Sequence, residues 1–211
     1  MKTNFSGMLK LGCILAIFAT TACVMLAFVY SGTSTIIAQR QQADLKSALG
    51  ELFPDADDFK AIDEIKSPDS AVAVESAYAA VKNGEIIGAA LSLSRASYSG
   101  PIKTMVGVGV SGHITGVKIM EHSDTPGLGA NAASPSYFVD RENHITFYGQ
   151  FIGKHSSHPF RVKDDVIPIT ASTITSNAVS ASVKAAGLAV HAWISGEEVD
   201  VVSSASEGGE K

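Results

Sequence analysis

Cysteine is scarce in this sequence: the chain has 211 residues and only two cysteines, Cys13 and Cys23. Both lie inside one uncharged apolar run near the N-terminus, so everything after that run lacks thiols. This excludes a disulfide or a thiolate metal site from the rest of the chain, because both need cysteine side chains. The compartment of the protein therefore has to be argued from membrane topology.

Positive charge is also sparse. The sequence has 16 Lys and Arg against 21 Asp and Glu, which gives a net charge of −5. The first thirty residues hold two of these cations and no acid, which leaves −7 for residues 31–211. A domain with this negative charge is not expected to bind nucleic acid.

The short motifs of hydrolases and nucleotidases are missing: G-x-S-x-G, H-E-x-x-H and the Walker loop do not occur, so we expect no independent catalytic site. Gly107, Gly109 and Gly112 match the G-x-G-x-x-G spacing of dinucleotide sites, but the residues that follow alternate as a strand rather than a helix. We interpret them as glycines that let strands twist or pack closely. His155 and His158 have no second ligand pair nearby in sequence, so no metal site is predicted.

One long apolar run is present. Leu11 to Tyr30 has twenty residues without a charge, and at 1.5 Å per residue it roughly matches a hydrocarbon core of about 30 Å. We predict a transmembrane helix at 11–30 after a short N-terminal segment, 1–10. A cleaved signal peptide is the less favoured alternative. Signal peptides have a shorter apolar run followed by a small-x-small cleavage site, whereas this run is longer and no clean site of that kind follows it. A lipoprotein signal is weaker still, since Thr20 stands where a large aliphatic residue is needed before Cys23.

Positive charges near this helix predict its orientation. Lys2 and Lys10 lie on its N-terminal side, while the first cation on the other side is Arg40. The positive-inside rule therefore places the N-terminus in the cytoplasm and the large domain outside it, with lipid around the helix.

The segment after the membrane reads as helical and then changes to strands. Ile36, Leu45, Leu49 and Leu52 have roughly helical spacing within Thr35 to Leu52, which Pro54 closes. We predict a membrane-proximal helical segment over 31–70. Two hairpins follow, the first with an Asn-Gly turn at 83 and 84 between strands 78–82 and 85–94, and the second with strands 102–110 and 113–121. Four strands in series predict an antiparallel sheet.

The last regular element is a helix from about Ser176 to Ile194. Apolar residues recur there at steps of four and three: Val179, Val183, Ala186, Val190 and Trp193. Helices before and after the sheet predict an α+β fold. The predicted domain occupies 71–195, and a flexible Ser, Glu and Gly rich tail occupies 196–211.

A run of small hydroxyl residues, ITASTITS at 169–176, stands immediately before this helix. Thr175 or Ser176 is expected to cap the free amides of the first turn. A helix start is also a natural place for a phosphate, to which a neighbouring hydroxyl can be esterified.

Here the sequence resembles a known family, the FMN-binding domain subunits of Rnf and sodium-pumping quinone reductase complexes. In that family the last threonine of a D-x-x-[S/T]-G-A-T motif carries FMN through its phosphate, and 170–173 aligns with the last four positions. The segment 125–129 resembles the family's T-P-G-L-G loop, and it follows an I-x-G-V type strand at 114–117. The segment 150–154 resembles its Q-F-x-G-K segment. The likeness covers roughly residues 75–195.

The resemblance implies a covalent FMN phosphoester at Thr173. The sequence departs from the motif at three places: Ala171 replaces glycine, Ser172 replaces alanine, and Ile167 stands where the aspartate would be, with Asp165 two places earlier. The residues expected at the cofactor are the hydroxyls of the helix start and part of the T-P-G-L-G loop: Thr170, Ser172, Thr173, Thr175, Ser176, Thr125, Gly127 and Leu128.

The resemblance also implies a role and partners. Length and the compact membrane-proximal segment fit the G subunit of the Rnf ion-translocating electron transport complex better than the C subunit of the sodium-translocating NADH:quinone reductase. The expected function is an electron carrier in the bacterial inner membrane, with the flavin domain on the periplasmic side. Its partners are then the other Rnf subunits and a flavin transferase for maturation. A non-flavin anchored structural or assembly protein and a noncovalent FMN sensor remain alternatives.

Overall fold

The computed structural model describes residues 5–196, with side chains from Gly7 onward. The predicted segment 1–10 therefore lies partly, and the predicted tail 196–211 almost wholly, outside the described residues. The chain forms two compact units, of which the first ends at Ser47 and the second begins at Ala48.

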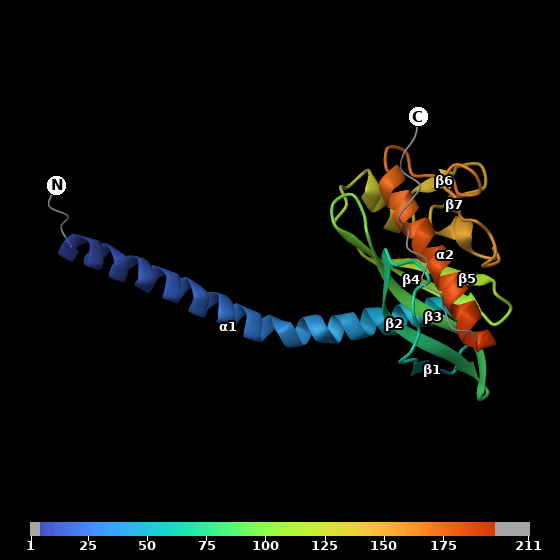
Figure 1. The fold of residues 1–211 in the computed structure, drawn as a ribbon, viewed down its shortest axis with the longest axis horizontal. Helices are drawn as coiled ribbons and strands as arrows, with labels where there is room; N and C mark the ends of the chain where they lie inside the picture. The colour runs from blue at the N-terminus through green and yellow to red at the C-terminus, as the bar shows by residue number, and fades with distance from the viewer. Residues whose placement is uncertain (1–4, 197–211) are drawn as a thin grey trace. The chain divides into compact units, whose positions relative to one another are not determined.

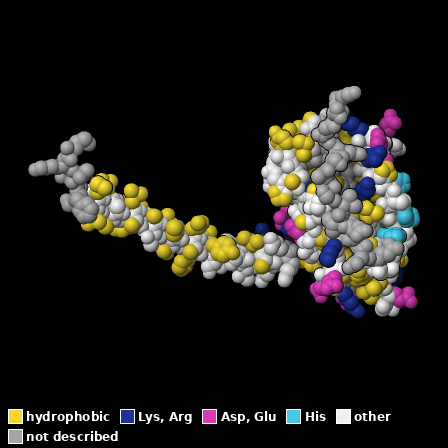
Figure 2. Space-filling view, viewed as in Figure 1, with side chains coloured by type: hydrophobic (Ala, Val, Ile, Leu, Met, Phe, Trp, Pro, Cys, Tyr) yellow, Lys and Arg dark blue, Asp and Glu magenta, His cyan; other side chains and the backbone are white. Residues whose placement is uncertain are grey.

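The first element is a helix of 48 residues, α1 (Phe5–Leu52), that contains the predicted transmembrane run. Hydrophobic side chains are spread along it (Figure 2), and by length and composition it can cross a membrane. The sequence predicted a separate helix from Thr35, but the polar residues between the two segments do not interrupt α1. Thr33 is tolerated there because its hydroxyl donates to the carbonyl of Val29 one turn back, at 2.9 Å.

The last turn of α1 belongs to the second unit and is buried there. Leu52 and Phe53 are 3% and 5% exposed, and Pro54 follows them as expected for a helix stop. They lie on glycines of the sheet: a Cβ added to Gly107 would stand 3.1 Å from both the Leu52 Cβ and the Phe53 Cε2. The sheet therefore uses glycine where this helix end approaches, as the sequence interpretation of these glycines expected.

The second unit is built on one sheet whose strand order follows the chain (Figure 1). Its five strands are β1 (Asp58–Ala61), β2 (Val72–Lys82), β3 (Glu85–Ala96), β4 (Pro101–Gly109) and β5 (Ile114–Glu121), and every pair is antiparallel. The predicted four-strand sheet is confirmed. The expectation that 31–70 is helical is wrong beyond Leu52, because β1 pairs with β2 inside that range.

The turns of the two hairpins lie where the sequence placed them. Asn83 and Gly84 have φ of 52° and 84° between the paired residues Lys82 and Glu85, as a type I′ turn requires. In the second hairpin, Gly112 has φ of 78° between β4 and β5. The glycines of the G-x-G-x-x-G pattern thus belong to an antiparallel hairpin, which contradicts a dinucleotide loop.

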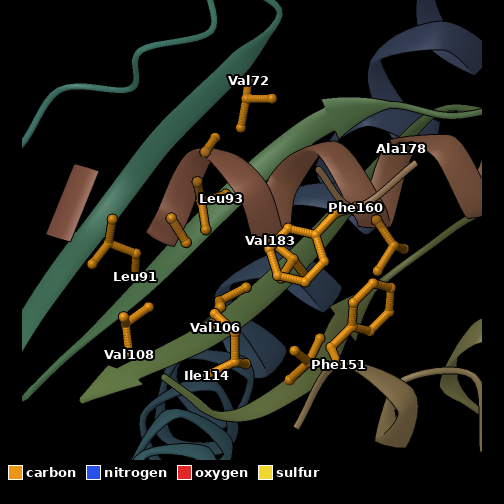
Figure 3. Close-up of a cluster of buried hydrophobic side chains, with 14 of the residues drawn as sticks. Val72, Leu91, Leu93, Val106, Val108, Ile114, Phe151, Phe160, Ala178 and Val183 are labelled. Carbon is orange, nitrogen blue, oxygen red and sulfur yellow. The ribbon is translucent and has the colours of Figure 1, made fainter. Parts of the chain in front are cut away.

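Helix α2 (Thr173–Ser195) packs against β3 and β4, and its inner face was predicted correctly. Val179, Val183, Ala186 and Val190 are fully buried, and the close-up in Figure 3 shows Val183 beside Phe160, with Leu93 and Val106 of the sheet close by. The helix begins three residues earlier than the predicted Ser176.

The connection between β5 and α2 is long and mostly irregular. It contains two 3-10 turns, η1 (Gly129–Ala133) and η2 (Gly149–Phe151), and a small hairpin of β6 (Phe138–Asp140) and β7 (Ile145–Thr146). Phe147 and Phe151 fix it to the core because both rings are fully buried there, and the two rings contact each other edge to face with centroids 5.6 Å apart. Within the described residues no cluster of three metal-ligating side chains occurs, and the His155 ring instead contacts His113 edge-on at 5.1 Å.

Candidate functional site

A cavity of about 440 Å³ lies between the loop after β5 and the start of α2. Its volume falls within the range of small-molecule sites. It is lined by Tyr98, Asp124, Thr125, Leu128, Gly129, Ala171, Ser172, Thr173, Ile174 and Thr175. The structure thus brings together the two segments, 125–129 and 170–173, that carried the family resemblance.

Most of the predicted cofactor residues line this cavity, but three do not. Thr125, Leu128, Ser172, Thr173 and Thr175 line it, whereas Thr170, Gly127 and Ser176 do not. The lining residues that sequence reasoning missed are Tyr98, Asp124, Gly129, Ala171 and Ile174. Asp124 directly precedes the T-P-G-L-G loop, so its position beside a polar, glycine-rich loop was the one signal available for it.

The start of α2 has no side-chain cap. Ser172 is the N-cap residue, but its side chain makes no capping hydrogen bond. The prediction that Thr175 or Ser176 caps the helix is wrong, because α2 begins at Thr173 and both residues lie inside its first turn. The Ser176 hydroxyl is instead buried, donating to the Ser172 carbonyl at 2.9 Å and accepting from the Ile169 amide at 3.0 Å.

The first-turn amides of α2 therefore lack the usual intrahelical and side-chain acceptors. Together with the helix dipole, they place partial positive charge at the cavity wall. The described lining residues include no Lys or Arg, so this helix start is the main source of positive potential for an anion there.

Two threonines of this turn differ in access. The side chain of Thr173 is exposed and lines the cavity, whereas Thr175 is 1% exposed and its hydroxyl is already hydrogen-bonded. Only Thr173 of this pair presents a hydroxyl that an incoming phosphate group can reach.

Ala171 has an unusual backbone conformation. Its φ is 60°, in the left-handed region that favours glycine, within the turn closed by the bond from the Ser172 amide to the Ile169 carbonyl at 3.0 Å. This is the position where the resembled motif has glycine. The turn is kept although alanine is strained there, since α2 and the bonds of Ser176 hold both of its ends.

Asp124 is the buried charge of the site, at 6% exposure. Its Oδ2 accepts hydrogen bonds from the Ser97 hydroxyl at 2.9 Å and the Thr175 hydroxyl at 2.7 Å, and its Oδ1 accepts from the Ser99 amide at 3.0 Å. Burial alone raises the pKa of Asp124, but the bonds from Thr175, Ser99 and Ser97 and the nearby His122 outweigh it and hold the pKa below its ordinary value.

The rest of the cavity wall is apolar and open. Tyr98, Leu128 and Ile174 are 74%, 43% and 54% exposed, although large apolar side chains usually lie in the core. A cavity lined by an uncapped helix start and by exposed apolar side chains fits a phosphorylated molecule with a planar ring system. These residues therefore fit FMN.

Comparison with known families gives two matches. The FMN-binding domain family matches residues 97–187, which include every residue that lines the cavity, and the RnfG N-terminal region matches residues 1–52, which include α1.

Several known proteins are similar over most of the chain, and each is named as the G subunit of its complex. The protein from an ion-translocating oxidoreductase complex of Aliivibrio fischeri (strain MJ11) is 32% identical over 85% of this chain and 88% of its own length. The protein from a Na(+)-translocating ferredoxin:NAD(+) oxidoreductase complex of Acetobacterium woodii is 28% identical over 87% and 91%. The protein from a proton-translocating ferredoxin:NAD(+) oxidoreductase complex of Clostridium ljungdahlii is 32% identical over 77% and 80%.

Proposed function

The chain belongs to the family of G subunits of ion-translocating oxidoreductase complexes, and on that premise we propose that it carries electrons through an FMN esterified to Thr173. The observation that carries the proposal is the position of Thr173: an exposed hydroxyl at an uncapped helix start, inside a cavity of suitable size. The FMN-binding domain family supports FMN as the cofactor.

Attachment needs chemistry from another protein. A flavin transferase would use FAD as the donor: the Thr173 oxygen would form an ester bond to the FMN phosphorus, the pyrophosphate bond to AMP would break, AMP would leave and the hydroxyl proton would be lost. The cavity contributes position, because the α2 amides stabilise the phosphate charge while Thr175 is withheld by Asp124. Of the described residues around Thr173, none forms a nucleophile and base pair that would catalyse the transfer.

Electron transfer is then the chemistry of the flavin, and the protein sets its surroundings. Tyr98, Leu128 and Ile174 provide the apolar wall for the ring and exclude part of the water around it. Because the ester is made through the phosphate, the ring itself stays unmodified and its potential depends on these neighbours.

Membrane attachment fits this role. We propose that α1 holds the chain in the bacterial inner membrane with the flavin domain on the periplasmic side, because Lys2 and Lys10 precede the apolar run and Arg40 follows it. Its expected partners are the other subunits of the Rnf complex, as the names of its relatives indicate. Lipid surrounds the apolar part of α1.

Denaturing gels test the attachment. The full chain is expressed with a flavin transferase, and its band is viewed under ultraviolet light while intact mass is measured. Wild type is expected to fluoresce, Thr173→Val to be dark and without added mass, and the matched variant Thr175→Val to keep both signals. A dark wild-type band would contradict the assignment. So would a signal that disappears in Thr175→Val and persists in Thr173→Val. Acid-releasable flavin would favour a noncovalent site.

The orientation is tested separately. Glu142 is exposed in the second unit and can be replaced by cysteine after Cys13 and Cys23 are changed to alanine. A membrane-impermeant maleimide is expected to label this cysteine from outside the inner membrane. Labelling only after the inner membrane is broken would place the flavin domain in the cytoplasm.

A further inference from the structure

Asp124 connects three separate segments at the cavity. It precedes the loop 125–129, it binds Thr175 on α2, and it binds both Ser97 and Ser99 in the turn between β3 and β4. The carboxylate therefore holds this turn against the start of α2.

The residue between the two serines is Tyr98. It is 74% exposed, yet it lines the cavity, and both of its neighbours in the chain are hydrogen-bonded to Asp124, Ser97 through its hydroxyl and Ser99 through its backbone amide. The turn is also closed on itself by the bond from the Ser97 amide to the Gly100 carbonyl at 2.8 Å. The turn that carries this largely exposed tyrosine is thus held beside the site.

A carboxylate suits this arrangement better than a neutral side chain. Its two oxygens accept from three donors, namely two hydroxyls and a backbone amide. An amide side chain at position 124 offers one accepting oxygen and turns a donor NH₂ toward one or more of these donors. The arrangement of the turn therefore depends on the ionised form of Asp124.

We propose that Asp124 is a positioning residue that holds Tyr98 against the isoalloxazine ring of the flavin. This inference rests on the proposed function, since it takes the flavin to lie in the cavity beside Thr173. Aromatic rings prefer offset or edge-to-face contact with a neighbouring π-system, and Tyr98 is the aromatic side chain that lines this cavity. Asp124 acts through the tyrosine and needs no contact with the ring.

Flavin fluorescence lifetime measures this contact. A tyrosine or tryptophan ring that touches an excited flavin quenches its emission by donating an electron that then returns, whereas phenylalanine does not. The full chain is loaded by coexpression with the transferase, intact mass gives the fraction that carries FMN, and the lifetime is read per bound flavin. Tyr98→Phe is expected to lengthen the lifetime, and Tyr98→Trp to keep it short.

Tyr137 is the control tyrosine. Its hydroxyl accepts a hydrogen bond of 3.3 Å from the Thr170 amide in the turn before α2, but it does not line the cavity. Tyr137→Phe is expected to leave the lifetime unchanged. An unchanged lifetime in Tyr98→Phe, or a lengthened one in Tyr137→Phe alone, overturns the proposal.

The role of Asp124 is separated from that of Tyr98 by combining variants. Asp124→Asn and the milder Ser97→Ala are each expected to lengthen the lifetime, and the double variant of Asp124→Asn with Tyr98→Phe is expected to match Tyr98→Phe alone. Additive changes would show that Asp124 acts on the flavin by another route and overturn its positioning role. A wild-type chain without added flavin mass contradicts the proposed function, and this inference falls with it.

Discussion

The Thr175 hydroxyl donates a hydrogen bond of 2.7 Å to Asp124 Oδ2, and the two residues are 51 positions apart in the sequence. Both side chains are buried. This bond joins the loop after β5 to the first turn of α2, and it occupies the hydroxyl that competes with Thr173 as a site of esterification. In the proposed attachment, the cavity wall and the choice of Thr173 over Thr175 therefore depend on the same contact.

Loss of this bond should lower stability without removing the cofactor. In Thr175→Val the buried Asp124 Oδ2 keeps its hydrogen bond from the Ser97 hydroxyl but loses the shorter one from Thr175. This loss is expected to reduce the free energy of unfolding by about 1 to 2 kcal/mol. Chemical denaturation of the apo chain in detergent measures the change. Thr173→Val is the matched control and is expected to alter the free energy by less than about 0.5 kcal/mol, because its hydroxyl is exposed. Equal losses in both variants would contradict the buried role of Thr175.

Asp124 should also give the domain an acid-sensitive stability. Its pKa is lower in the folded protein than the ordinary value of 3.8, because its hydrogen bonds favour the carboxylate more than burial disfavours it. The ionised group therefore contributes stability that is fully present above this ordinary, unfolded-state pKa and is lost as the pH falls through the lower folded-state pKa.

Urea denaturation between about pH 6 and pH 3 tests this linkage. Asp124→Asn is expected to be less stable than wild type at pH 6 and to lose less stability as the solution is acidified. Asp140→Asn is the comparison variant, because hydrogen bonds from Asn143 and Glu142 also lower the pKa of this exposed carboxylate, and its share of the acid slope is measured in the same way. If Asp124→Asn shows the same acid slope as wild type, the carboxylate is not the linked group.

The parts of the fold that the sequence predicted well depend on local signals. The Asn83 and Gly84 pair requires positive φ in a two-residue turn, so one dipeptide located the first hairpin. The buried face of α2 repeats with helical spacing over four turns, and that periodicity identifies the helix even when its first residue is placed wrongly. Strand β1 was missed because DFKA is four residues long, mostly exposed, and defined by its pairing with β2 rather than by its own pattern.

In the candidate site, too, the sequence revealed local motifs but not the residues whose roles depend on long-range contacts. The two motif segments could be found because a family resemblance carried them. Asp124 and Tyr98 could not, since their roles come from contacts over 25 to 51 residues that no local spacing encodes. The N-cap was misassigned because Ser172, Thr173, Thr175 and Ser176 have similar capping propensities, and only the turn before them decides where α2 begins.

The strained turn at Ala171 predicts a stabilising substitution. Ala171 has φ of 60°, and a left-handed conformation costs an alanine about 1 kcal/mol more than a glycine. Ala171→Gly is therefore expected to raise the free energy of unfolding by up to about 1 kcal/mol, although glycine also gains freedom in the unfolded chain. It restores the glycine of the resembled motif, so the fraction of chain that carries FMN should be equal to or higher than in wild type. A lower stability together with less attachment would show that the alanine methyl is needed.

The contact between the end of α1 and the sheet gives the last prediction. A Cβ added to Gly88 would lie 2.5 Å from the Val108 carbonyl oxygen and 2.7 Å from the Phe53 ring, closer than atoms can approach. Gly88→Ala is therefore expected to destabilise the second unit by about 1 to 3 kcal/mol, because a strand or the Phe53 ring has to move. Gly50 is the matched control: it is exposed on the last turns of α1 with no neighbour within 4 Å of an added Cβ. Gly50→Ala should stabilise by up to about 1 kcal/mol, since alanine favours a helix interior. Denaturation of the two variants side by side measures the opposite changes expected in the free energy of unfolding. A Gly88→Ala variant as stable as wild type would mean that Phe53 does not rest on the sheet at this position.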